Sequence, residues 1–339
     1  MGKDATIHDV ADATGVSIRT VSRVLNRSPK VSAETRERIE AAIARLRFSP
    51  SARARGLATG RSYLIGVIHN DRNALVLDTI QRGVVAEATA RGYELVIHPT
   101  PTGDDGSVAD VLDFVRRSRV DGVVVMPPVS GVAGMGQALA TAGVPAVALS
   151  AAPIDGFAAL LVSNEREAAA EVARHFIDLG HRRIAIINGP RGVFSASERR
   201  AGFIAALKSA GLCPAGEAEG DYDFDSGYAA AEKLLALNPR PTAIFAGNDI
   251  MAAALIKAAA AHGVAVPDEL SVVGFDGSML ARMLTPSLTS VHRPLGDMAQ
   301  LAARRLIDIV ENEPGRVELK AQLRLTLGES SGPAPAEAP

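Results

Sequence analysis

The sequence contains few aromatic residues, one cysteine and no tryptophan. Aromatics make up 4% of its 339 residues, so the core must consist mainly of Ala, Val, Leu and Ile. Cys213 has no second cysteine with which to form an internal disulfide, and this usage is typical of proteins from a reducing cytoplasm.

Long apolar runs and metal-ligand spacings are also missing. No stretch reaches the roughly 18 uninterrupted apolar residues that a membrane-spanning helix needs, so we expect no membrane contact. The N-terminal residues 1–4 turn polar at once, without the apolar segment of a signal peptide, which indicates a cytoplasmic protein. The 7 histidines are scattered and His-Glu-x-x-His is absent, so we expect neither a metal site nor a cofactor.

The net charge of −2 conceals an uneven distribution along the chain. Residues 1–61 carry 12 Lys and Arg against 6 Asp and Glu, a net charge of +6, whereas residues 62–339 carry 24 against 32, a net charge of −8. A small basic head on a large acidic body indicates an anionic partner for the head alone. A general nucleic-acid coat protein, which would be basic throughout, is excluded.

Three short helices are predicted in the head. Thr6 is expected to cap the first helix, with Asp9 reaching back to it, and Gly15 to end that helix. Ser17 is expected to cap a second helix that runs to about residue 26, and Ser32 to begin a third. This arrangement predicts a helix-turn-helix domain over residues 1–49.

The outward side of the second helix carries side chains suited to DNA. Near its N-terminal end, which enters the major groove in this motif, lie four candidates for reading base edges: Ile18, Arg19, Ser22 and Arg23. Three further side chains have the right chemistry for phosphate contacts: Ser17, Thr20 and Asn26. The alternative is a small helical bundle whose arginines are merely solvated.

Residues 50–61 are predicted to form a linker that orders only on a partner. An isolated helix of eight residues is unstable in water, and Gly56 weakens this one further. Arg53 and Arg55 suit phosphates at a minor groove, and Leu57 is an apolar wedge for base steps. A plain flexible linker remains the alternative.

Apolar runs alternate with helix-length segments through residues 62–327. The runs lie at residues 64–68, 93–97, 122–126 and 146–149, and, after residue 160, at 184–187, 243–246 and 270–274. This alternation predicts two doubly wound α/β lobes with parallel sheets and a ligand site at the carboxyl ends of their strands. Residues 328–339, rich in Gly, Pro and Ala, are expected to form a disordered tail.

Polar residues follow several of the predicted strands. Asn73, Arg199, Asn248 and Asp276 are expected to converge in the cleft between the lobes, where they would bind a polyhydroxylated ligand. Asp249 is interpreted as a helix cap rather than a ligand contact.

The head carries the residues of a known family. Residues 6–11, Gly15-Val16-Ser17 and residues 20–26 resemble, without a gap, the lac repressor/galactose repressor family. By position, Ile18, Arg19 and Arg23 match its base-reading residues, although many relatives carry Tyr in place of Ile18. The resemblance also implies that hinge helices pair across a dimer and insert Leu57.

The body resembles the periplasmic-binding-protein-like effector domain of the same family. The matching segments are residues 180–184, 199–203, 248–249 and 273–276. The resemblance implies effector contacts for Arg199, Asn248 and Asp276 and a stacking position for Tyr222. Ser150 is a sixth candidate for effector contact; it stands where many sugar-responsive relatives have an acidic residue, so the ligand itself is not implied.

The sequence therefore predicts a transcriptional regulator, not an enzyme. It is expected to be a bacterial, cytoplasmic and nucleoid-associated homodimer that binds a pseudo-palindromic operator and represses a carbohydrate-utilisation operon. A small-molecule effector, a sugar or a derivative, would set its operator affinity from the interlobe cleft as inducer or corepressor. The alternatives are a doubly wound enzyme, or a sugar-binding protein, with an appended DNA-binding head.

Overall fold

The computed structural model divides the chain into two compact units, residues 1–63 and 64–339. It describes residues 5–25, 28, 30–48, 60–70, 73–100, 104–313 and 319–336. Residues 50–59 of the predicted linker, with Arg53, Arg55 and Leu57, and the predicted phosphate contact Asn26 lie outside the described residues.

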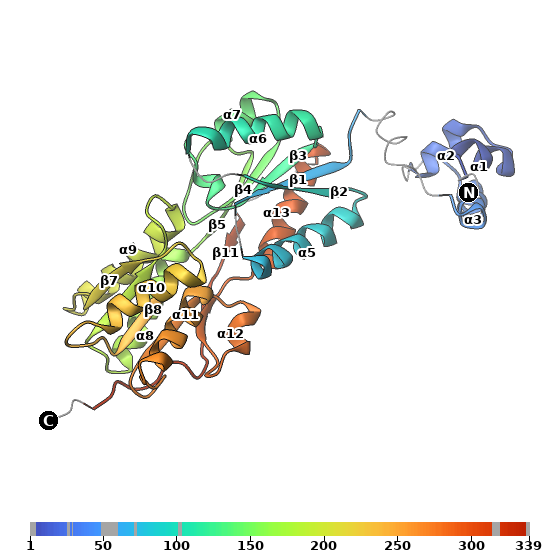
Figure 1. The fold of residues 1–339 in the computed structure, drawn as a ribbon. Coiled ribbons are helices and arrows are strands. Elements are labelled where there is room, and N and C mark those ends of the chain that lie inside the picture. The colour runs from blue at the N-terminus through green and yellow to red at the C-terminus, as the bar shows by residue number, and fades with distance from the viewer. Residues whose placement is uncertain are drawn as a thin grey trace. The chain divides into compact units, whose positions relative to one another are not determined.

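The described residues of the head form three helices, as predicted (Figure 1). They are α1 (Ile7–Thr14), α2 (Ile18–Leu25) and α3 (Ala33–Leu46). Thr6 and Asp9 form the expected capping box, and Gly15 ends α1 in the left-handed region at φ 65°. Val10, Val21 and Ile39, one from each helix, are fully buried together and hold the three helices in one core.

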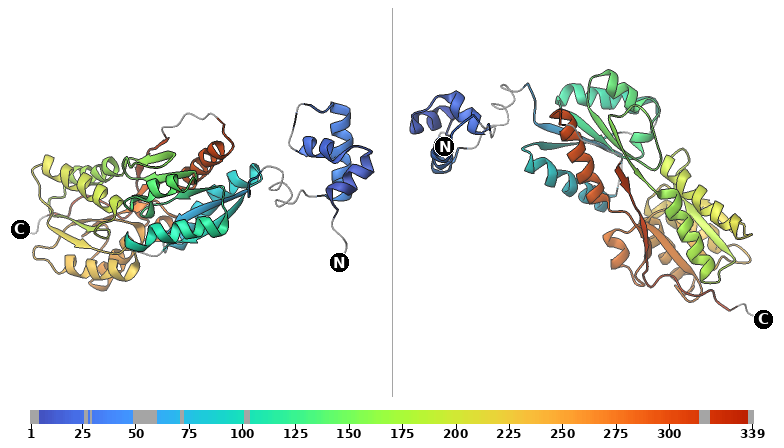
Figure 2. Two further views of the ribbon diagram at one scale, coloured as in Figure 1. Left: turned by 90° about the horizontal axis from the view of Figure 1, so that it is seen from above. Right: turned by 180° about the vertical axis from the view of Figure 1, so that it is seen from behind.

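The body contains two six-stranded sheets, each covered on both faces by helices (Figures 1 and 2). The first sheet has the order β11-β5-β4-β3-β1-β2 and is parallel throughout. Its strands are β1 (Leu64–His69), β2 (Glu94–Pro99), β3 (Gly122–Val125), β4 (Ala146–Ser150), β5 (Ala159–Ser163) and β11 (Leu319–Ala321).

Helices of the first lobe pack on opposite faces of this sheet. One face is covered by α5 (Ala74–Ala90) and α13 (Leu295–Val310), and the other by α6 (Asp104–Ser118) and α7 (Met135–Thr141) (Figure 1). A short 3-10 helix, η1 (Val129–Gly131), follows β3. The buried runs expected over β1, β3 and β4 are confirmed.

The second sheet has the order β12-β10-β9-β8-β6-β7. Only β12 runs antiparallel to its neighbour. Its strands are β6 (Ile184–Asn188), β7 (Gly216–Glu219), β8 (Ala243–Ala246), β9 (Ser271–Asp276), β10 (Thr289–His292) and β12 (Arg324–Thr326). The helices of this lobe are α8 (Glu165–Asp178), α9 (Phe194–Ser209), α10 (Phe224–Leu235), α11 (Asp249–Ala261) and α12 (Met279–Met283).

Alternate residues of the central strands face opposite layers. Ala185 and Ile187 pack under α10 and α11, whereas Ile184 and Ile186 pack under α8 and α9. Helices α8 and α9 approach so closely that a Cβ on Gly202 would lie 1.9 Å from the Arg166 carbonyl oxygen. This packing requires the glycine of the segment Arg199–Phe203.

The chain crosses between the lobes three times. It passes from β5 to α8 at Asn164, from β10 to α13 at residues 293–294, and from β11 to β12 at residues 322–323. The Asn164 side chain accepts a hydrogen bond from the Leu323 amide at 2.8 Å and thereby joins two of the crossings. Three crossings, two of which share a hydrogen bond, form the hinge between the lobes.

The expectation of a disordered tail from residue 328 is wrong for residues 328–334. Ser330 is fully buried, donates to the Val272 carbonyl at 2.6 Å and accepts from the Thr289 amide at 2.9 Å. Ala334 donates to the Leu179 carbonyl at 2.8 Å. The segment satisfies backbone groups at the end of the second sheet, and its Gly- and Pro-rich composition gives no sign of this role.

Candidate functional site

The exposed side of α2 presents the residues predicted to meet DNA. Ile18 is 40% exposed, Arg19 is exposed, and Ser22 and Arg23 are half-buried. Ser17 accepts a hydrogen bond from the Thr20 amide at 3.2 Å, which caps the helix, and the two hydroxyls lie 2.9 Å apart. These positions agree with the sequence-based assignment, which stays a prediction.

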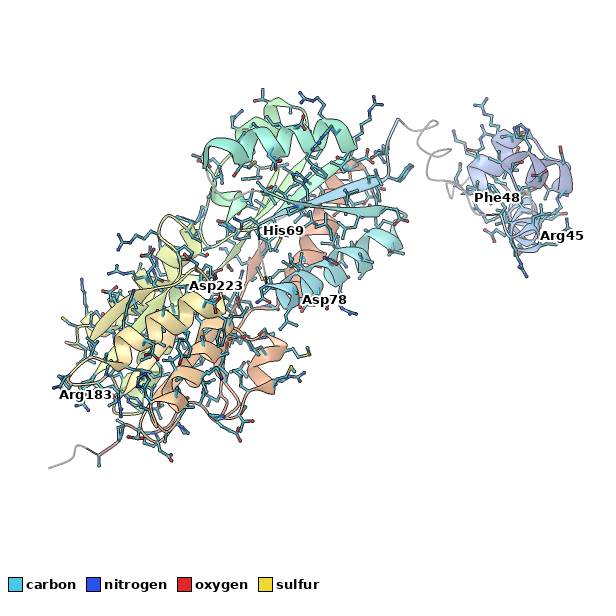
Figure 3. The ribbon with its side chains drawn as sticks, viewed as in Figure 1. Arg45, Phe48, His69, Asp78, Arg183 and Asp223 are labelled. Atoms are coloured by element: carbon cyan, nitrogen blue, oxygen red, sulfur yellow. The ribbon has the colours of Figure 1, made fainter. Side chains whose placement is uncertain are left out.

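A pocket of about 620 Å³ lies in the body, between the two lobes. Its lining comes from the ends of β1, β3, β6, β8 and β9 and from the N-terminal ends of α5, α9 and α11. His69 and Asp223 line it from opposite lobes (Figure 3). This is the position expected for the ligand site of paired parallel sheets.

A buried group of charged side chains lies at the pocket and the hinge. Arg199 is 3% exposed, and its Nε donates to Glu165 Oε2 at 2.8 Å. Its Nη1 donates to the Gly247 carbonyl at 2.6 Å, and its guanidinium carbon lies 3.8 Å from the centre of the Phe275 ring. Arg199 is therefore held rigidly by contacts within the second lobe.

Arg293 connects this group to the second hinge crossing. Its Nη1 lies 3.0 Å from Asp276 Oδ1, and its Nη2 lies 3.6 Å from Glu165 Oε1. The Arg293 Nε is buried and has no hydrogen-bond partner within the described part of the chain. Because Glu165 and Arg293 stand on different crossings, their interaction joins the hinge to the pocket wall.

Electrostatics in this group favour a charged Glu165. Burial alone would raise the pKa of its carboxyl, but Arg199 and Arg293 outweigh burial and hold that pKa below its ordinary value. The side chain is 1% exposed. A buried carboxylate between two guanidinium groups is thus stable as an ion.

Two pocket residues have a left-handed backbone. Asp276 has φ 118° and Tyr222 has φ 62°, values that residues other than glycine rarely adopt. The Tyr222 ring lies over Gly189, where a Cβ would come within 2.2 Å of the ring carbon Cζ. Backbone strain of this kind is concentrated at functional sites, and here it directs both side chains into the pocket.

Asn248 and Asp249 position α11 beside the pocket. Asn248, not Asp249, caps the helix: its Oδ1 accepts from the Met251 amide at 2.8 Å, and its Nδ2 donates to the Tyr222 carbonyl at 3.0 Å. The interpretation of Asp249 as the cap is therefore wrong by one residue. Asp249 instead accepts hydrogen bonds from the Ser278 amide at 2.7 Å and from the Ser290 hydroxyl at 2.5 Å.

The carboxyl of Asp249 has an unusual affinity for protons. Burial raises its pKa most, and the nearby Asp276 carboxylate raises it further, to about 7. The hydrogen bonds that Asp249 accepts from Ser290 and Ser278 act in the opposite direction and lower the pKa. Asp249 therefore keeps its proton to a higher pH than an exposed aspartate does.

The pocket brings together most of the residues predicted for it. The lining contains five of the six: Asn73, Arg199, Tyr222, Asn248 and Asp276. Ser150 is buried at the end of β4 and is not among the lining residues, because β4 does not contribute to the pocket surface. Sequence reasoning missed Arg293 and Phe194, which line the pocket, and Glu165, which pairs with Arg199.

The described residues offer no group of three or more His, Cys, Asp or Glu side chains that would hold a metal ion. Among the helices of the described ranges, none is long and apolar enough to cross a membrane.

Family comparisons match both units. A family model described as bacterial regulatory proteins of the lacI family matches residues 6–51, and one described as a periplasmic binding protein-like domain matches residues 173–331. The ribose operon repressor of Escherichia coli (strain K12) is 35% identical over 327 residues, which cover 96% of this chain and 98% of the relative. Its name denotes a repressor rather than an enzyme.

Solved structures agree with these matches. The lac repressor dimer bound to operator and the anti-inducer ONPF has a TM-score of 0.80 at 28% identity, covering 97% of this chain and all of the other. The complex of the transcriptional regulator CelR with cellobiose has a TM-score of 0.70 at 30% identity, covering 96% and 99%. The fold prediction, a helix-turn-helix head and two doubly wound lobes, is confirmed.

Proposed function

Because the chain belongs to the lacI family of bacterial regulatory proteins, we propose that a sugar bound between its lobes controls the affinity of its head for an operator. The chain is a DNA-binding repressor with an effector-binding domain. The observation that carries the proposal is the interlobe pocket, whose lining includes Asp276 and whose wall is tied to the hinge through Arg293. One relative is named a repressor of the ribose operon, and the structure of CelR is a complex with cellobiose, which supports a carbohydrate effector.

DNA binding is assigned to α2. Arg19 and Arg23 are proposed to read guanine edges, Ile18 a thymine methyl and Ser22 a neighbouring base, while Ser17, Thr20 and Asn26 hold phosphates. Arg53, Arg55 and Leu57 are proposed to enter the minor groove next to each half-site. This division separates residues that specify the operator from residues that position the head.

The regulator is proposed to act as a homodimer on a pseudo-palindromic operator. Two copies of α2 are needed to read two half-sites, and the symmetry of such a site mirrors that of the protein. The apolar side chains of Met279 and Met283, 53% and 68% exposed on one face of α12, support a dimer surface on the body. Since its target is chromosomal DNA, we place the protein in the cytoplasm, associated with the nucleoid.

Ligand control follows from the geometry of the hinge. A ligand that contacts Asp276 from one side and Asn73 from the other favours one angle between the lobes over another. The three crossings convert that preference into a changed spacing of the two heads of a dimer. A coupling of about 1–3 kcal/mol would change operator affinity about 5–150-fold.

The DNA-binding part is tested by selecting duplexes from a random pool with the full chain. We expect an inverted repeat, because a symmetric dimer places two recognition helices on one face of the duplex. Arg23→Ala should relax specificity at one position of each half-site, at a loss of about 1–3 kcal/mol for the preferred base.

The matched control is Arg45→Ala, on the exposed part of α3. It should leave the selected sequence unchanged, since α3 carries none of the proposed base contacts. Recovery of the same consensus with the same selectivity from Arg23→Ala would remove Arg23 from the base-reading set.

A further inference from the structure

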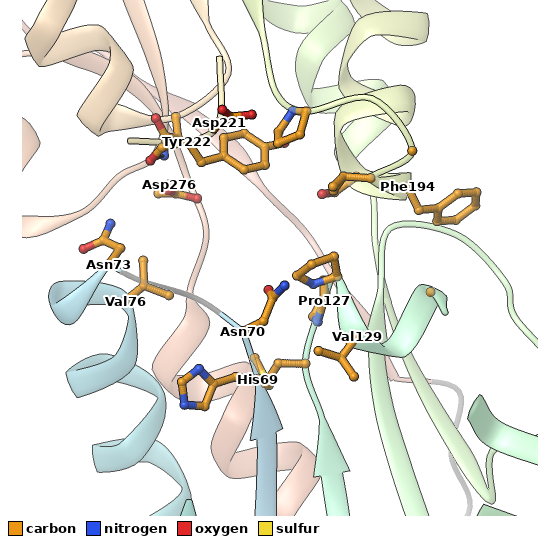
Figure 4. A pocket seen from close by; sticks show the side chains of 18 of the residues that line it. His69, Asn70, Asn73, Val76, Pro127, Val129, Phe194, Asp221, Tyr222 and Asp276 are labelled. Carbon is orange, nitrogen blue, oxygen red and sulfur yellow. Dashed lines mark hydrogen bonds between the residues drawn. The ribbon is translucent and has the colours of Figure 1, made fainter. Parts of the chain in front are cut away.

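Two side chains of the pocket stand on backbone that needs support from its surroundings. Tyr222 and Asp276 line the pocket from the second lobe (Figure 4), with φ 62° and 118°. A residue other than glycine keeps such a conformation only when neighbouring groups hold it there. The contacts that hold these two stretches of backbone therefore decide where both side chains point.

The turn that carries Asp276 is held at the two residues that follow it. The Gly277 amide donates to the Ser290 hydroxyl at 3.1 Å. The Ser278 amide and hydroxyl both donate to Asp249 Oδ2, at 2.7 Å and 2.8 Å. Because both residues are bonded to groups on other elements, the turn has little freedom to rotate Asp276 out of the left-handed region.

Asp249 holds both of these contacts in place. The Ser290 hydroxyl that accepts from Gly277 itself donates to Asp249 Oδ1 at 2.5 Å, so the carboxylate anchors the first contact indirectly and the second directly. A Cβ on Gly274 would lie 2.6 Å from Asp249 Oδ1, which shows that this glycine of β9 makes room for the carboxylate. Asp249 is not among the residues that line the pocket. Its effect on the pocket is therefore exerted through the turn.

The preceding residue, Asn248, supports the other strained residue in the same way. Its Nδ2 donates to the Tyr222 carbonyl at 3.0 Å, while its Oδ1 caps α11. The helix behind the pair is well anchored, because Ala252 and Leu255 are fully buried in the core of the lobe. The start of α11 is thus a fixed point from which two adjacent side chains support the strained backbone of the pocket.

The helix dipole alone does not account for Asp249. A carboxylate in the first turn of a helix is stabilised by the dipole, but an exposed one gains this stabilisation as well. Asp249 is 1% exposed, and its burial, together with the nearby Asp276 carboxylate, raises the pKa of its carboxyl. An acidic group that three hydrogen bonds hold in so unfavourable a place indicates a role at the pocket.

We propose that Asp249 is a positioning residue for effector binding: through Ser278 and Ser290 it holds the turn that directs Asp276 into the pocket, without touching the ligand. This inference rests on the proposed function, in which Asp276 contacts the effector. Loss of Asp249 should therefore weaken effector binding and leave the affinity of the ligand-free protein for the operator unchanged.

Two replacements of Asp249 separate positioning from folding. Asp249→Ala removes all three hydrogen bonds. In Asp249→Asn the amide oxygen can still accept from Ser278, and the amide nitrogen can donate to the oxygen of Ser290, so the turn remains held.

Titration calorimetry of the full-length protein, with D-ribose and cellobiose as probes, measures the effect on binding. For the sugar that binds, the affinity should fall at least about tenfold in Asp249→Ala and stay within about threefold in Asp249→Asn. Ser290→Ala, which removes only the bridge to Gly277, should weaken binding severalfold and serves as the second variant if Asp249→Ala does not fold. Affinity for the selected duplex without sugar should stay within about twofold in every variant.

The matched control is Ser330→Ala. It also removes buried hydrogen bonds of the second lobe, but Ser330 is not among the residues that line the pocket. Its affinity for the sugar should stay within about twofold of the unchanged chain. Equal weakening in Ser330→Ala and Asp249→Ala would overturn the positioning role, because sugar binding would then follow the stability of the lobe.

Hydrogen exchange of the ligand-free protein, followed by mass spectrometry, gives a readout that needs no effector. The amides of residues 277–278 should exchange at least about tenfold faster in Asp249→Ala than in the unchanged chain. Unchanged exchange there, or unchanged sugar affinity in Asp249→Ala, would overturn the proposal. If neither sugar binds the unchanged chain, that result counts against the carbohydrate effector, while the exchange rates still decide the role of Asp249.

Discussion

Two oppositely charged side chains, Arg199 and Glu165, are buried together where the second lobe meets the hinge. A buried ion pair is weak evidence of stability, because desolvation offsets much of the attraction between the charges. Removal of one partner is strongly destabilising, since it leaves an uncompensated charge in the interior. The pair therefore specifies the arrangement of the site more than it stabilises the fold.

Glu165→Gln should lower the free energy of unfolding by about 3 kcal/mol, because Arg199 would keep its charge without a counterion. Urea denaturation of the full-length protein measures this change. The matched control is Glu217→Gln, which breaks the exposed pair with Arg200 and should cost about 0–1 kcal/mol. Equal losses in the two variants would show that burial of Arg199 has no energetic consequence.

Asp249 makes stability depend on pH in a defined direction. Its carboxyl has a pKa of about 7 in the folded chain against an ordinary value of 3.8, so the folded state binds the proton more tightly than the unfolded state. Its contribution to stability is therefore present below about pH 4 and is lost as the pH rises toward 7.

Asp249→Asn should remove this part of the pH dependence. Denaturation at about pH 5 and about pH 8 should show a smaller fall in stability for the variant than for the unchanged chain. An identical fall in both proteins would mean that Asp249 is already ionised across this range.

The sequence predicted those site residues that follow strongly apolar strands. Asn248 and Asp276 come directly after buried runs, so the rule that sites lie at strand ends applied to them. Glu165 follows β5, whose apolar run at residues 159–162 was not among the predicted strands, and Arg293 follows β10, in which Val291 is the one apolar residue. Glu165 and Arg293 come together only because two crossings lie side by side in the folded chain. No local sequence pattern indicates such a contact.

Among the elements, the C-terminal segment differs most from expectation. Residues 328–334 have the composition of a linker, yet they hydrogen-bond to β9, to the start of β10 and to the end of α8. The bonds come from backbone groups, such as the Ser330 carbonyl that accepts from the Val272 amide, and from the single hydroxyl of Ser330, so composition alone misled the prediction. The sequence analysis also missed β7, β10, β11 and β12, which are only three to four residues long, and the apolar five-residue strand β5.

Ser330→Ala tests the contribution of this segment. The change leaves the Val272 carbonyl without this hydroxyl donor and the Thr289 amide without its acceptor, and should lower the free energy of unfolding by about 1–3 kcal/mol. The control is Ser209→Ala on α9, whose exposed hydroxyl donates to the Ala205 carbonyl. That change should stay within about 0.5 kcal/mol in the same urea titration. A similarly small change in Ser330→Ala would show that the segment is dispensable.

At the scale of the whole molecule, the uneven charge of the sequence corresponds to the division of the chain into two units. The head, with its excess of positive charge, contains α2 and its arginines, whereas the acidic body contains the pocket, in which Arg199 pairs with Glu165 and Arg293 with Asp276. Domain order and fold class were readable from sequence because charge, caps and apolar periodicity all pointed the same way. The identity of the ligand was not readable from the sequence, because it depends on which side chains the two lobes place around the ligand.

The central claim is that occupation of the interlobe pocket changes the affinity of the head for DNA. The most direct measurement is the dissociation constant for the selected duplex, by fluorescence anisotropy at fixed salt, without ligand and with a saturating sugar. We expect a change of about 5–150-fold in the full-length chain. The change should be lost in Asp276→Asn and kept in Asp268→Asn, an exposed carboxylate outside the pocket lining. A dissociation constant that stays the same while calorimetry shows the pocket to be full would contradict the account.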